Sequence, residues 1–259
     1  FKLGENIMPR FSIAIPTHDR GENGPKWMRE LLDSLKNQTF RDFDIVVSDQ
    51  SKNDKILNVC KEYSDDFEFT YVRYEGDVPC ENINVGLNEC KGDIIKMMFS
   101  DDVIVDSKAL EIINNTYETT DYKWAFSGFC GTKDGVNTYD HRVPLWTEHT
   151  LEGRNLLSSP SVVSFLNQCK VEFDENLKLL LDVDFYHRMR VNNGKPCIIP
   201  EVLVANRDHD DRISSNATSN YDCVYEHPEG GWLMNSKELK YVTEKYSNFF
   251  PHRKYPDEN

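Results

Sequence analysis

Short apolar runs recur along the first hundred residues and are separated by segments with helical periodicity. The runs that we predict to be buried strands cover residues 11–15, 44–48, 69–73 and 94–99. Between them, apolar side chains recur at the spacing of one helix face, which predicts helices through residues 27–35, 56–60 and 82–90. Strands that alternate with helices at such short intervals require crossover connections, so the pattern predicts an α/β fold with a largely parallel sheet.

The second half of the chain is less regular, with long polar stretches between its apolar runs. We expect strands at 124–129 and 162–166, an apolar run at 197–205, and helices at 177–190 and 239–246. Residues 130–161 are rich in polar and turn residues, which predicts a long functional loop or a small subsheet. The polar stretch 208–231 fits a mobile lid. No repeat or linker divides the chain, so we expect one domain with an elaborated C-terminal part.

Carboxylates follow several of the predicted strands at the point where each strand ends. The apolar run Met97–Phe99 leads through Ser100 into Asp101 and Asp102, and Asp19 and Asp49 follow two earlier strands. The carboxyl ends of parallel strands meet at one edge of a sheet, where such folds bind their ligands. Carboxylate oxygens are ligands of Mg²⁺ and Mn²⁺, so the pattern predicts a metal site for a phosphorylated donor. Adjacent Asp residues after a strand are also typical of a solvated turn or a helix N-cap.

Composition narrows the class of protein. The formal net charge of −14 argues against a broad nucleic-acid surface, although a local basic groove stays open. The seven cysteines are scattered without a Cys-x-x-Cys pair, which favours reduced thiols in the cytoplasm and disfavours a zinc site. There is no apolar stretch long enough to cross a bilayer and no signal-peptide pattern, so we expect a cytoplasmic protein without a transmembrane segment.

Taken in order, the motifs of residues 11–215 resemble those of the family 2 inverting glycosyltransferases. The matching segments are Ser12–Arg20, Ser34–Phe40 with Asp44–Asp49, Asn84–Leu87 with Lys91–Ile94, Ser100–Asp102 at the position of the DxD motif, Phe173–Glu175 with Leu181–Phe185, and Arg207–His209 with Ser214 and Ser215. The resemblance implies the GT-A fold, a Rossmann-like, mostly parallel sheet flanked by helices with an irregular C-terminal acceptor and lid region. It divides the single domain 1–259 into a nucleotide-sugar-binding half at about 8–105, an acceptor and catalytic half at about 106–215, and a C-terminal extension at about 216–259.

The resemblance also implies roles for the donor site. Asp49 stands where the family accepts a hydrogen bond from the N3–H of uracil, with a helix N-cap as the alternative. Thr17 and Asp19 occupy the loop that contacts the base or ribose, although ordinary loop polarity explains them equally well. Asp101 matches the residue that contacts the ribose, and Asp102 matches the ligand of Mn²⁺ or Mg²⁺ that bridges to the donor diphosphate.

Further on, the resemblance implies the catalytic residues. Asp182 matches the general base that takes the proton of the acceptor hydroxyl, although a surface acid on an amphipathic helix is the alternative. Its apolar neighbours could raise its pKa by desolvation, which is a hypothesis. His209 matches a late metal ligand. Arg207 or Arg212 could pair with the diphosphate.

Two positions depart from the family pattern. Ser100 replaces the first Asp of the usual DxD, and Ile83 stands where the family commonly has an Arg before the Asn. We interpret the first departure as reduced redundancy of metal ligands. The second implies altered contacts to the sugar or diphosphate.

These residues predict a metal-dependent inverting glycosyltransferase of the hexosyltransferase class. It would move a sugar from a nucleoside-diphosphate donor, expected to be a UDP-sugar, to a hydroxyl acceptor, with a glycan favoured and nucleic acid disfavoured. One alternative is a sugar-phosphate nucleotidyltransferase, but residues 17–24 are acidic and lack a glycine-rich phosphate cradle. The other is a non-catalytic nucleotide- or carbohydrate-binding module, which would not need a base at Asp182.

Overall fold

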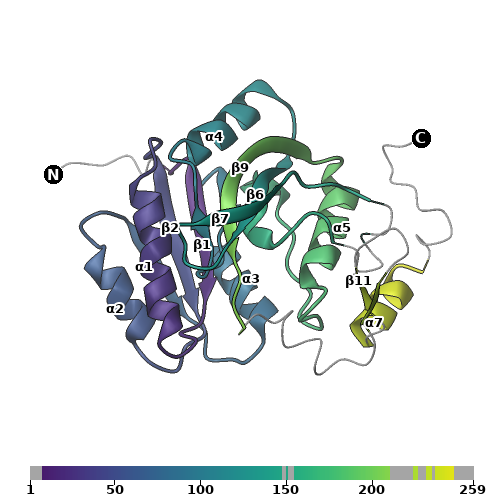
Figure 1. The fold of residues 1–259 in the computed structure, drawn as a ribbon, viewed down its shortest axis with the longest axis horizontal. Coiled ribbons are helices and arrows are strands. Elements are labelled where there is room, and N and C mark those ends of the chain that lie inside the picture. The colour runs from purple at the N-terminus through teal and green to yellow at the C-terminus, as the bar shows by residue number, and fades with distance from the viewer. Residues whose placement is uncertain are drawn as a thin grey trace.

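The fold is that of a computed structural model, which describes residues 8–147, 150, 155–210, 224–226, 232–234 and 237–247 (Figure 1). The strands are β1 (Phe11–Thr17), β2 (Phe43–Asp49), β3 (Phe69–Arg73), β4 (Ile94–Met97), β5 (Val103–Ile104), β6 (Trp124–Thr132), β7 (Thr138–Arg142), β8 (Val163–Leu166), β9 (Cys197–Arg207), β10 (Val224–Glu226) and β11 (Trp232–Met234). The α-helices are α1 (Asn23–Lys36), α2 (Lys55–Glu62), α3 (Pro79–Glu89), α4 (Ala109–Thr119), α5 (Leu181–Asn193) and α7 (Lys237–Lys245), and η2 (Pro160–Val162) and η3 (Asn167–Cys169) are 3₁₀ turns.

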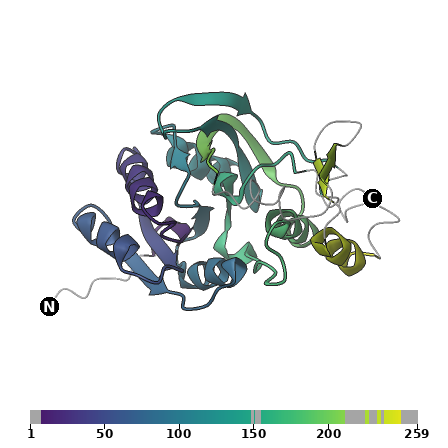
Figure 2. The same cartoon turned by 60° about the horizontal axis from the view of Figure 1, so that its bottom comes forward.

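The N-terminal half confirms the predicted crossover pattern. Strands β3, β2, β1 and β4 lie side by side in that order and are all parallel. Figure 2 shows α1 and α2 on one side of these strands and α3 on the other. The chain therefore reverses its winding direction between β1 and β4, which leaves a crevice at their carboxyl ends.

The second half completes a mixed sheet. Beyond β4 the order is β8, β6, β9 and β5, and β7 pairs with β6, so residues 130–161 contain a strand within the long connection that we expected. Pairing is parallel between β6 and β9 but antiparallel between β4 and β8, β6 and β8, β5 and β9, and β6 and β7. The predicted α/β fold is confirmed, with its parallel pairing concentrated in the N-terminal half.

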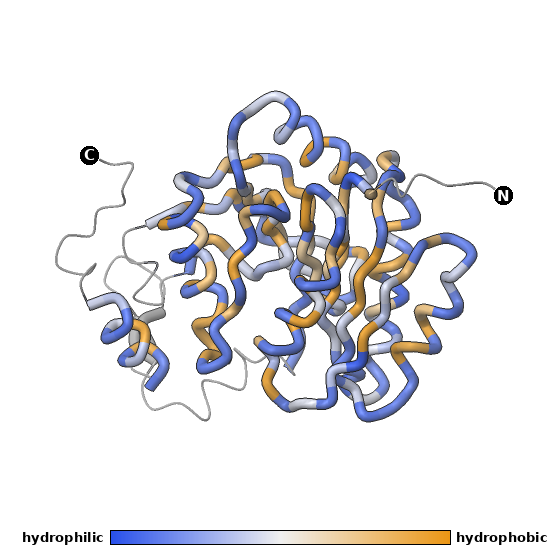
Figure 3. The backbone as a smooth tube through the Cα atoms, turned by 180° about the vertical axis from the view of Figure 1, so that it is seen from behind, coloured by the Kyte–Doolittle hydropathy of each residue, from blue (hydrophilic) through white to orange (hydrophobic). Residues whose placement is uncertain are grey.

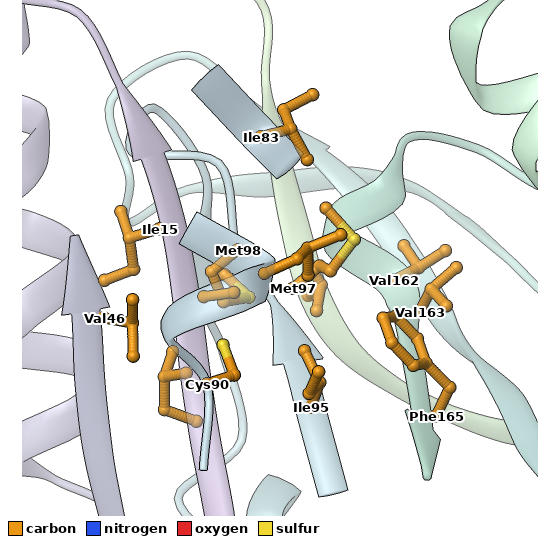
Figure 4. Close-up of a cluster of buried hydrophobic side chains, with 14 of the residues drawn as sticks. Ile15, Val46, Ile83, Cys90, Ile95, Met97, Met98, Val162, Val163 and Phe165 are labelled. Atoms are coloured by element: carbon orange, nitrogen blue, oxygen red, sulfur yellow. The ribbon is translucent and has the colours of Figure 1, made fainter. Parts of the chain in front are cut away.

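The core lies on both faces of the parallel strands. Figure 3 shows the apolar positions gathered along the strands and on the inner faces of the helices. In α1 the side chains of Leu31, Leu32 and Leu35 are fully buried, and burial of each stabilises the fold by about 1.5–3 kcal/mol. Figure 4 shows Met97 and Met98 in a cluster with Ile15 and other buried side chains. This packing fixes the end of β4 from which the acid pair emerges.

Two predicted boundaries are wrong for identifiable reasons. β4 ends at Met97 rather than Phe99, because the Phe99 N–H donates to Ser161 Oγ at 2.9 Å and leaves the sheet. α5 begins at Leu181 rather than residue 177, because side-chain acceptors from elsewhere bind the preceding backbone amides. The helix predicted at 239–246 is α7 (Lys237–Lys245).

Some expectations concern residues that the structure leaves undescribed. Most of the predicted lid, residues 208–231, lies outside the described residues, as does Arg212. Among the described helices, none combines the length and apolar character needed to cross a membrane.

Candidate functional site

A cleft opens at the carboxyl ends of β1 and β4, where the winding direction reverses. It consists of two adjoining cavities of about 180 and 380 Å³. Both are lined by Arg20, Phe99, Asp101, Lys178 and Leu181. The smaller cavity is also lined by Asp102, Ser159, Pro160, Leu179, Asp182 and Arg207, and the larger by Pro16, Thr17, His18, Gln50, Pro79, Asn82, Ile83 and Ser100. We call the pair the switch-point cleft.

The acid pair Asp101 and Asp102 is held from behind by the end of β9. The Arg207 N–H donates to Asp102 Oδ1 at 2.9 Å, and Arg207 Nε donates to the Asp101 carbonyl at 2.8 Å. His209 Nε2 lies 2.9 Å from Asp101 Oδ2. Burial by itself raises the pKa of Asp101, but the His209 hydrogen bond and the nearby Arg20 charge outweigh it and hold that pKa below its ordinary value. Asp101 is therefore ionised at neutral pH.

The side chain of Arg207 is buried among protein groups next to the acid pair. Its side chain is 1% exposed, and its guanidinium forms an ion pair with Glu30 and lies 5.7 Å from the Trp27 ring centre. Gly135, with φ +79°, passes so close that an added Cβ would lie 2.7 Å from Arg207 Nη2. The hydrogen bonds described for this guanidinium go to the Asp101 and Lys133 carbonyls and to Glu30, so it positions the acid pair, and its pairing with a diphosphate stays a prediction.

His209 packs beside the same cluster. Its ring centre lies 4.5 Å from that of Trp27, and its side chain is 10% exposed. Of the described cavities, it lines a separate one with Asn23, Lys133, Asp208 and Asp210 rather than the switch-point cleft. The contact with Asp101 orients the His209 ring, and the expected role of His209 as a metal ligand stays a prediction.

Asp182 lies in the first turn of α5 and lines the smaller cavity together with Asp101 and Asp102. Asn155 Nδ2 donates to its Oδ2 at 2.5 Å and the Val183 N–H donates to its Oδ1 at 2.7 Å. Burial nevertheless dominates and raises the pKa of Asp182 to about 6, in the direction that the sequence hypothesis anticipated. A carboxylate with this pKa is ionised at neutral pH and can still accept a proton.

Asp184, two residues beyond Asp182, is held within the protein. It is completely buried and is bound by Arg188, Lys245 and Tyr246. Its carboxylate therefore has several partners within the protein, and the two neighbouring acids of α5 differ in environment.

Asp49 is completely buried at the end of β2. Its Oδ1 accepts from the Ser51 N–H at 2.8 Å and the Ser51 hydroxyl at 2.5 Å, and its Oδ2 accepts from the Tyr71 hydroxyl at 2.6 Å. It is not among the described residues that line the cleft. The N-cap of α2 is Asp54, so the helix-cap alternative for Asp49 is wrong.

The first loop brings some of its predicted residues to the cleft and turns others away. Thr17 lines the larger cavity, and its hydroxyl donates to Ser100 Oγ at 2.8 Å. Asp19 instead accepts from Asn53. Arg20, with φ +41°, lines both cavities, although sequence reasoning assigned it no role.

Cations of the cleft were the main residues that sequence reasoning missed. Arg20 lies in the first-loop motif, so the sequence could have indicated a role for it. Lys178 lies in no motif, and nothing in the sequence pointed to it. Together they place two positive side chains along the wall that both cavities share. Such groups suit a polyanionic ligand.

A divalent cation would find its protein ligand at Asp102. Within the described part of the chain, no three His, Cys, Asp or Glu side chains form a group that could hold a metal by themselves. Mg²⁺ and similar ions are commonly held by one or two carboxylates together with substrate phosphates, so a single fixed carboxylate at the cavity wall fits this chemistry. The hydrogen bond from the Arg207 N–H orients that carboxylate.

Comparisons with known proteins agree with this arrangement. The sequence model of glycosyl transferase family 2 matches residues 12–170, which is more than half of the chain. An uncharacterised glycosyltransferase of Rickettsia typhi is 26% identical over 256 residues, which cover 92% of this chain and 76% of the relative.

Two solved structures show the same fold. Residues 1–349 of Staphylococcus aureus TarS, in complex with UDP-GlcNAc, match 94% of this chain and 67% of that chain with a TM-score of 0.70 and 19% identity. A mannosyltransferase of Pyrobaculum calidifontis, in complex with GDP-Man and Mn²⁺, matches 80% of this chain and 59% of that chain with a TM-score of 0.57 and 14% identity. The chain has the GT-A fold, belongs to glycosyl transferase family 2 and is a glycosyltransferase.

Proposed function

We propose that this glycosyltransferase moves a sugar from a UDP-sugar to a hydroxyl group of a glycan, with inversion at the anomeric carbon and with the help of Mn²⁺ or Mg²⁺. The observation that carries the proposal is that Asp182, with a pKa of about 6, lines the same smaller cavity as Asp101 and Asp102. A displacement at the anomeric carbon needs a base on one side and support for the leaving diphosphate on the other. The cavity holds groups of both kinds.

On the donor side, the larger cavity would receive the nucleoside and the smaller one the diphosphate and sugar. Thr17 and Asp101 would contact the base and ribose, and Arg20 and Lys178 would neutralise the phosphates. When a divalent cation is bound at Asp102, it supplies Lewis-acid stabilisation of the departing nucleoside diphosphate.

Uracil recognition is assigned to Asp49. Asp49 is fully buried and lines neither cavity, and the bonds from Ser51 and Tyr71 occupy three of its about four acceptor sites. The fourth would accept from the N3–H of the base only if donor binding exposes it. A cytosine base has no proton at N3 to donate. This acceptor would therefore favour uracil.

On the acceptor side, Asp182 would take the proton of the attacking hydroxyl as the new glycosidic bond forms. Asn155 and the Val183 N–H hold its two oxygens, which orients the carboxylate before the acceptor binds. Because the cavity wall excludes most water from Asp182, the carboxylate is a stronger base than an exposed aspartate.

The proposal is tested by donor binding and turnover in wild type and Asp182→Asn. A panel of nucleoside-diphosphate sugars with and without Mn²⁺ is scored by the rise in Tm, since a ligand of the folded state stabilises it by mass action. We expect a UDP-sugar to give the largest rise. Asp182→Asn should keep that rise and lose turnover by about 10²–10⁴-fold.

Glu175→Gln is the matched control, because Glu175 is exposed in the segment that precedes α5. It should leave both readouts unchanged. Equal donor hydrolysis and transfer by wild type and Asp182→Asn would remove Asp182 as the base. Donor binding without turnover in wild type would support a binding module instead.

A further inference from the structure

The C-terminal helix α7 lies directly beside α5, the helix that begins with the Asp182 turn (Figures 1 and 2). The two helices are 43 residues apart in the chain, from the end of α5 at Asn193 to the start of α7 at Lys237, with residues 194–236 between them. On the apolar side, Val242 of α7 is buried in the core and Tyr246, just after α7, packs on His187 of α5. The charged and polar contacts of this region reach the first turn of α5 or the segment before it.

Glu238 of α7 binds the backbone amides at the start of α5. Its Oε1 accepts from the Lys178 N–H at 3.1 Å, and its Oε2 accepts from the Leu179 and Leu180 N–H groups at 2.8 and 2.9 Å. The N-cap residue Leu180 has no side chain that could satisfy these groups. The Glu238 carboxylate, from another helix, therefore caps the N-terminus of α5 and also faces the positive end of the α5 dipole.

Lys245 of α7 anchors both flanks of the same turn. Its ammonium lies 2.6 Å from Asp174 Oδ2 and 2.7 Å from Asp184 Oδ1. Tyr246 donates to Asp184 Oδ1 at 2.6 Å, and Tyr241 donates to Asp174 Oδ2 at 2.9 Å. Although burial opposes both charges, these partners lower the pKa of Asp174 and raise the pKa of Lys245. Both groups are therefore charged across the neutral range.

The turn held in this way is a wall of the cleft. Lys178 and Leu181 line both cavities, and Leu179 and Asp182 line the smaller one. The three amides bound by Glu238 are thus those of residues in or directly before that wall. A shift of the turn would move Asp182 relative to Asp101 and Asp102, and a misplacement of about 1 Å can cost about 10²-fold in rate.

We propose that α7 is the clamp that positions the catalytic turn, and that Glu238 is a positioning residue for Asp182. This inference rests on the proposed function, because it takes Asp182 as the base. It assigns a role in catalysis to the C-terminal extension, which lies beyond the part matched by the family model.

The charge of Glu238 provides a readout that a purely structural role would not give. The titratable and charged groups around Asp182 are Glu238 of α7, Tyr186 of α5, Lys178 of the wall, and Arg20, Asp101, Asp102 and Arg207 across the cavity. The negative charge of Glu238 disfavours ionisation of Asp182 and so contributes to its raised pKa. Removing that charge should lower the pKa of Asp182, and any exposure of the carboxylate as the turn loosens would lower it further, because burial is the largest cause of the raised pKa. A variant that only loses folded protein would lower the rate at every pH and leave the acidic limb in place.

The test compares wild type, Glu238→Ala, Glu238→Gln and the control Glu244→Ala. Glu244 is exposed on the same helix and contacts only Lys240 among the ion pairs described for it. We expect Glu238→Ala to lower kcat by about tenfold or more with the donor KM nearly unchanged, and to shift the acidic limb of the kcat/KM profile to lower pH. Glu238→Gln keeps one acceptor and should recover part of kcat while showing the same shift, and Glu244→Ala should match wild type.

Hydrogen exchange of the amides of residues 178–180 tests the clamp without activity. Exchange should accelerate in Glu238→Ala and not in Glu244→Ala. Unchanged exchange overturns the clamp, and faster exchange with unchanged kcat and pH profile overturns the positioning role. If wild type binds donor but has no turnover, the proposed function fails, and a lack of faster exchange would then reject the clamp separately.

Discussion

Asn155 offers a direct way to perturb the proposed base without touching its carboxylate. Its Nδ2 donates to Asp182 Oδ2 at 2.5 Å and to the Ser158 carbonyl at 2.9 Å. A donor of this kind stabilises the ionised form of Asp182 and lowers its pKa, although burial outweighs it and the pKa is raised to about 6. In Asn155→Ala the burial remains and the donor is lost. The pKa of Asp182 must then rise further.

The size of the shift follows from the strength of that bond. A hydrogen bond to a charged group contributes about 1.5–3 kcal/mol when it is lost without replacement, and one pKa unit corresponds to about 1.36 kcal/mol. Asp182 is partly exposed to the cavity, so water replaces some of the lost bond. We therefore expect the acidic limb of the kcat/KM profile to move up by about one pH unit. The rate should fall about fivefold near pH 6 and hardly at all above about pH 8, because the base is fully ionised there in both proteins.

The assay is the rate of sugar transfer at limiting donor between about pH 5 and pH 9. Tm and the donor-induced rise in Tm, measured at each pH, separate a change in the base from a loss of folded protein. Glu175→Gln should leave the limb in place. A limb that stays where it is in Asn155→Ala, or that moves to lower pH, would falsify the assignment of the raised pKa to Asp182.

Two further predictions concern buried charge near the acid pair. Lys96 is completely buried, its ammonium donates to the Ser161 and Met97 carbonyls, and burial lowers its pKa to about 7, against the opposing charge of Asp102. The unfolded chain holds that proton more tightly, so the buried charge destabilises the fold fully below about pH 7 and this cost is relieved as pH rises. Wild type should therefore gain about 2–3 kcal/mol in the free energy of unfolding between about pH 6 and pH 9, and urea unfolding of Lys96→Met should show that this gain is lost. An unchanged dependence on pH in the variant would contradict this. Asp102→Asn should abolish the part of the donor-induced rise in Tm that depends on Mn²⁺, because each tenfold loss of affinity removes about 1.4 kcal/mol of stabilisation by the ligand. A cation-dependent rise that survives in the variant would exclude Asp102 as the ligand.

The parts of the fold that could be predicted are those encoded by local periodicity. The four parallel strands and their helices follow from apolar spacing, and the acids at strand ends follow from where the runs stop. The pairing direction of β8 could not be predicted in this way. Its chain enters the sheet after the long segment from 130 to 161, so no short-range pattern fixes the direction.

The residues that hold the site in place could not be predicted either, because no short-range pattern in the sequence links them to it. Arg207 reaches Asp102 across 105 positions, and Glu238 reaches Leu180 across 58. Asn155, which holds Asp182, lies in a turn-rich stretch without helical or strand periodicity. The chemistry of such residues is common in loops and on helix surfaces. Only the tertiary arrangement distinguishes them.

The departure at Ser100 has a consequence for how the cation would be held. An aspartate at this position could share the cation with the acid pair, but here the Ser100 hydroxyl accepts a hydrogen bond from Thr17 at 2.8 Å. Asp101 is engaged by His209 through its side chain. Asp102 lines the smaller cavity, and its orientation is set by the Arg207 N–H and the Ser159 hydroxyl rather than by a second acid. Because one carboxylate would carry the protein's share of the ligation, cation dependence should respond to Asp102→Asn more sharply than it would with an aspartate at position 100.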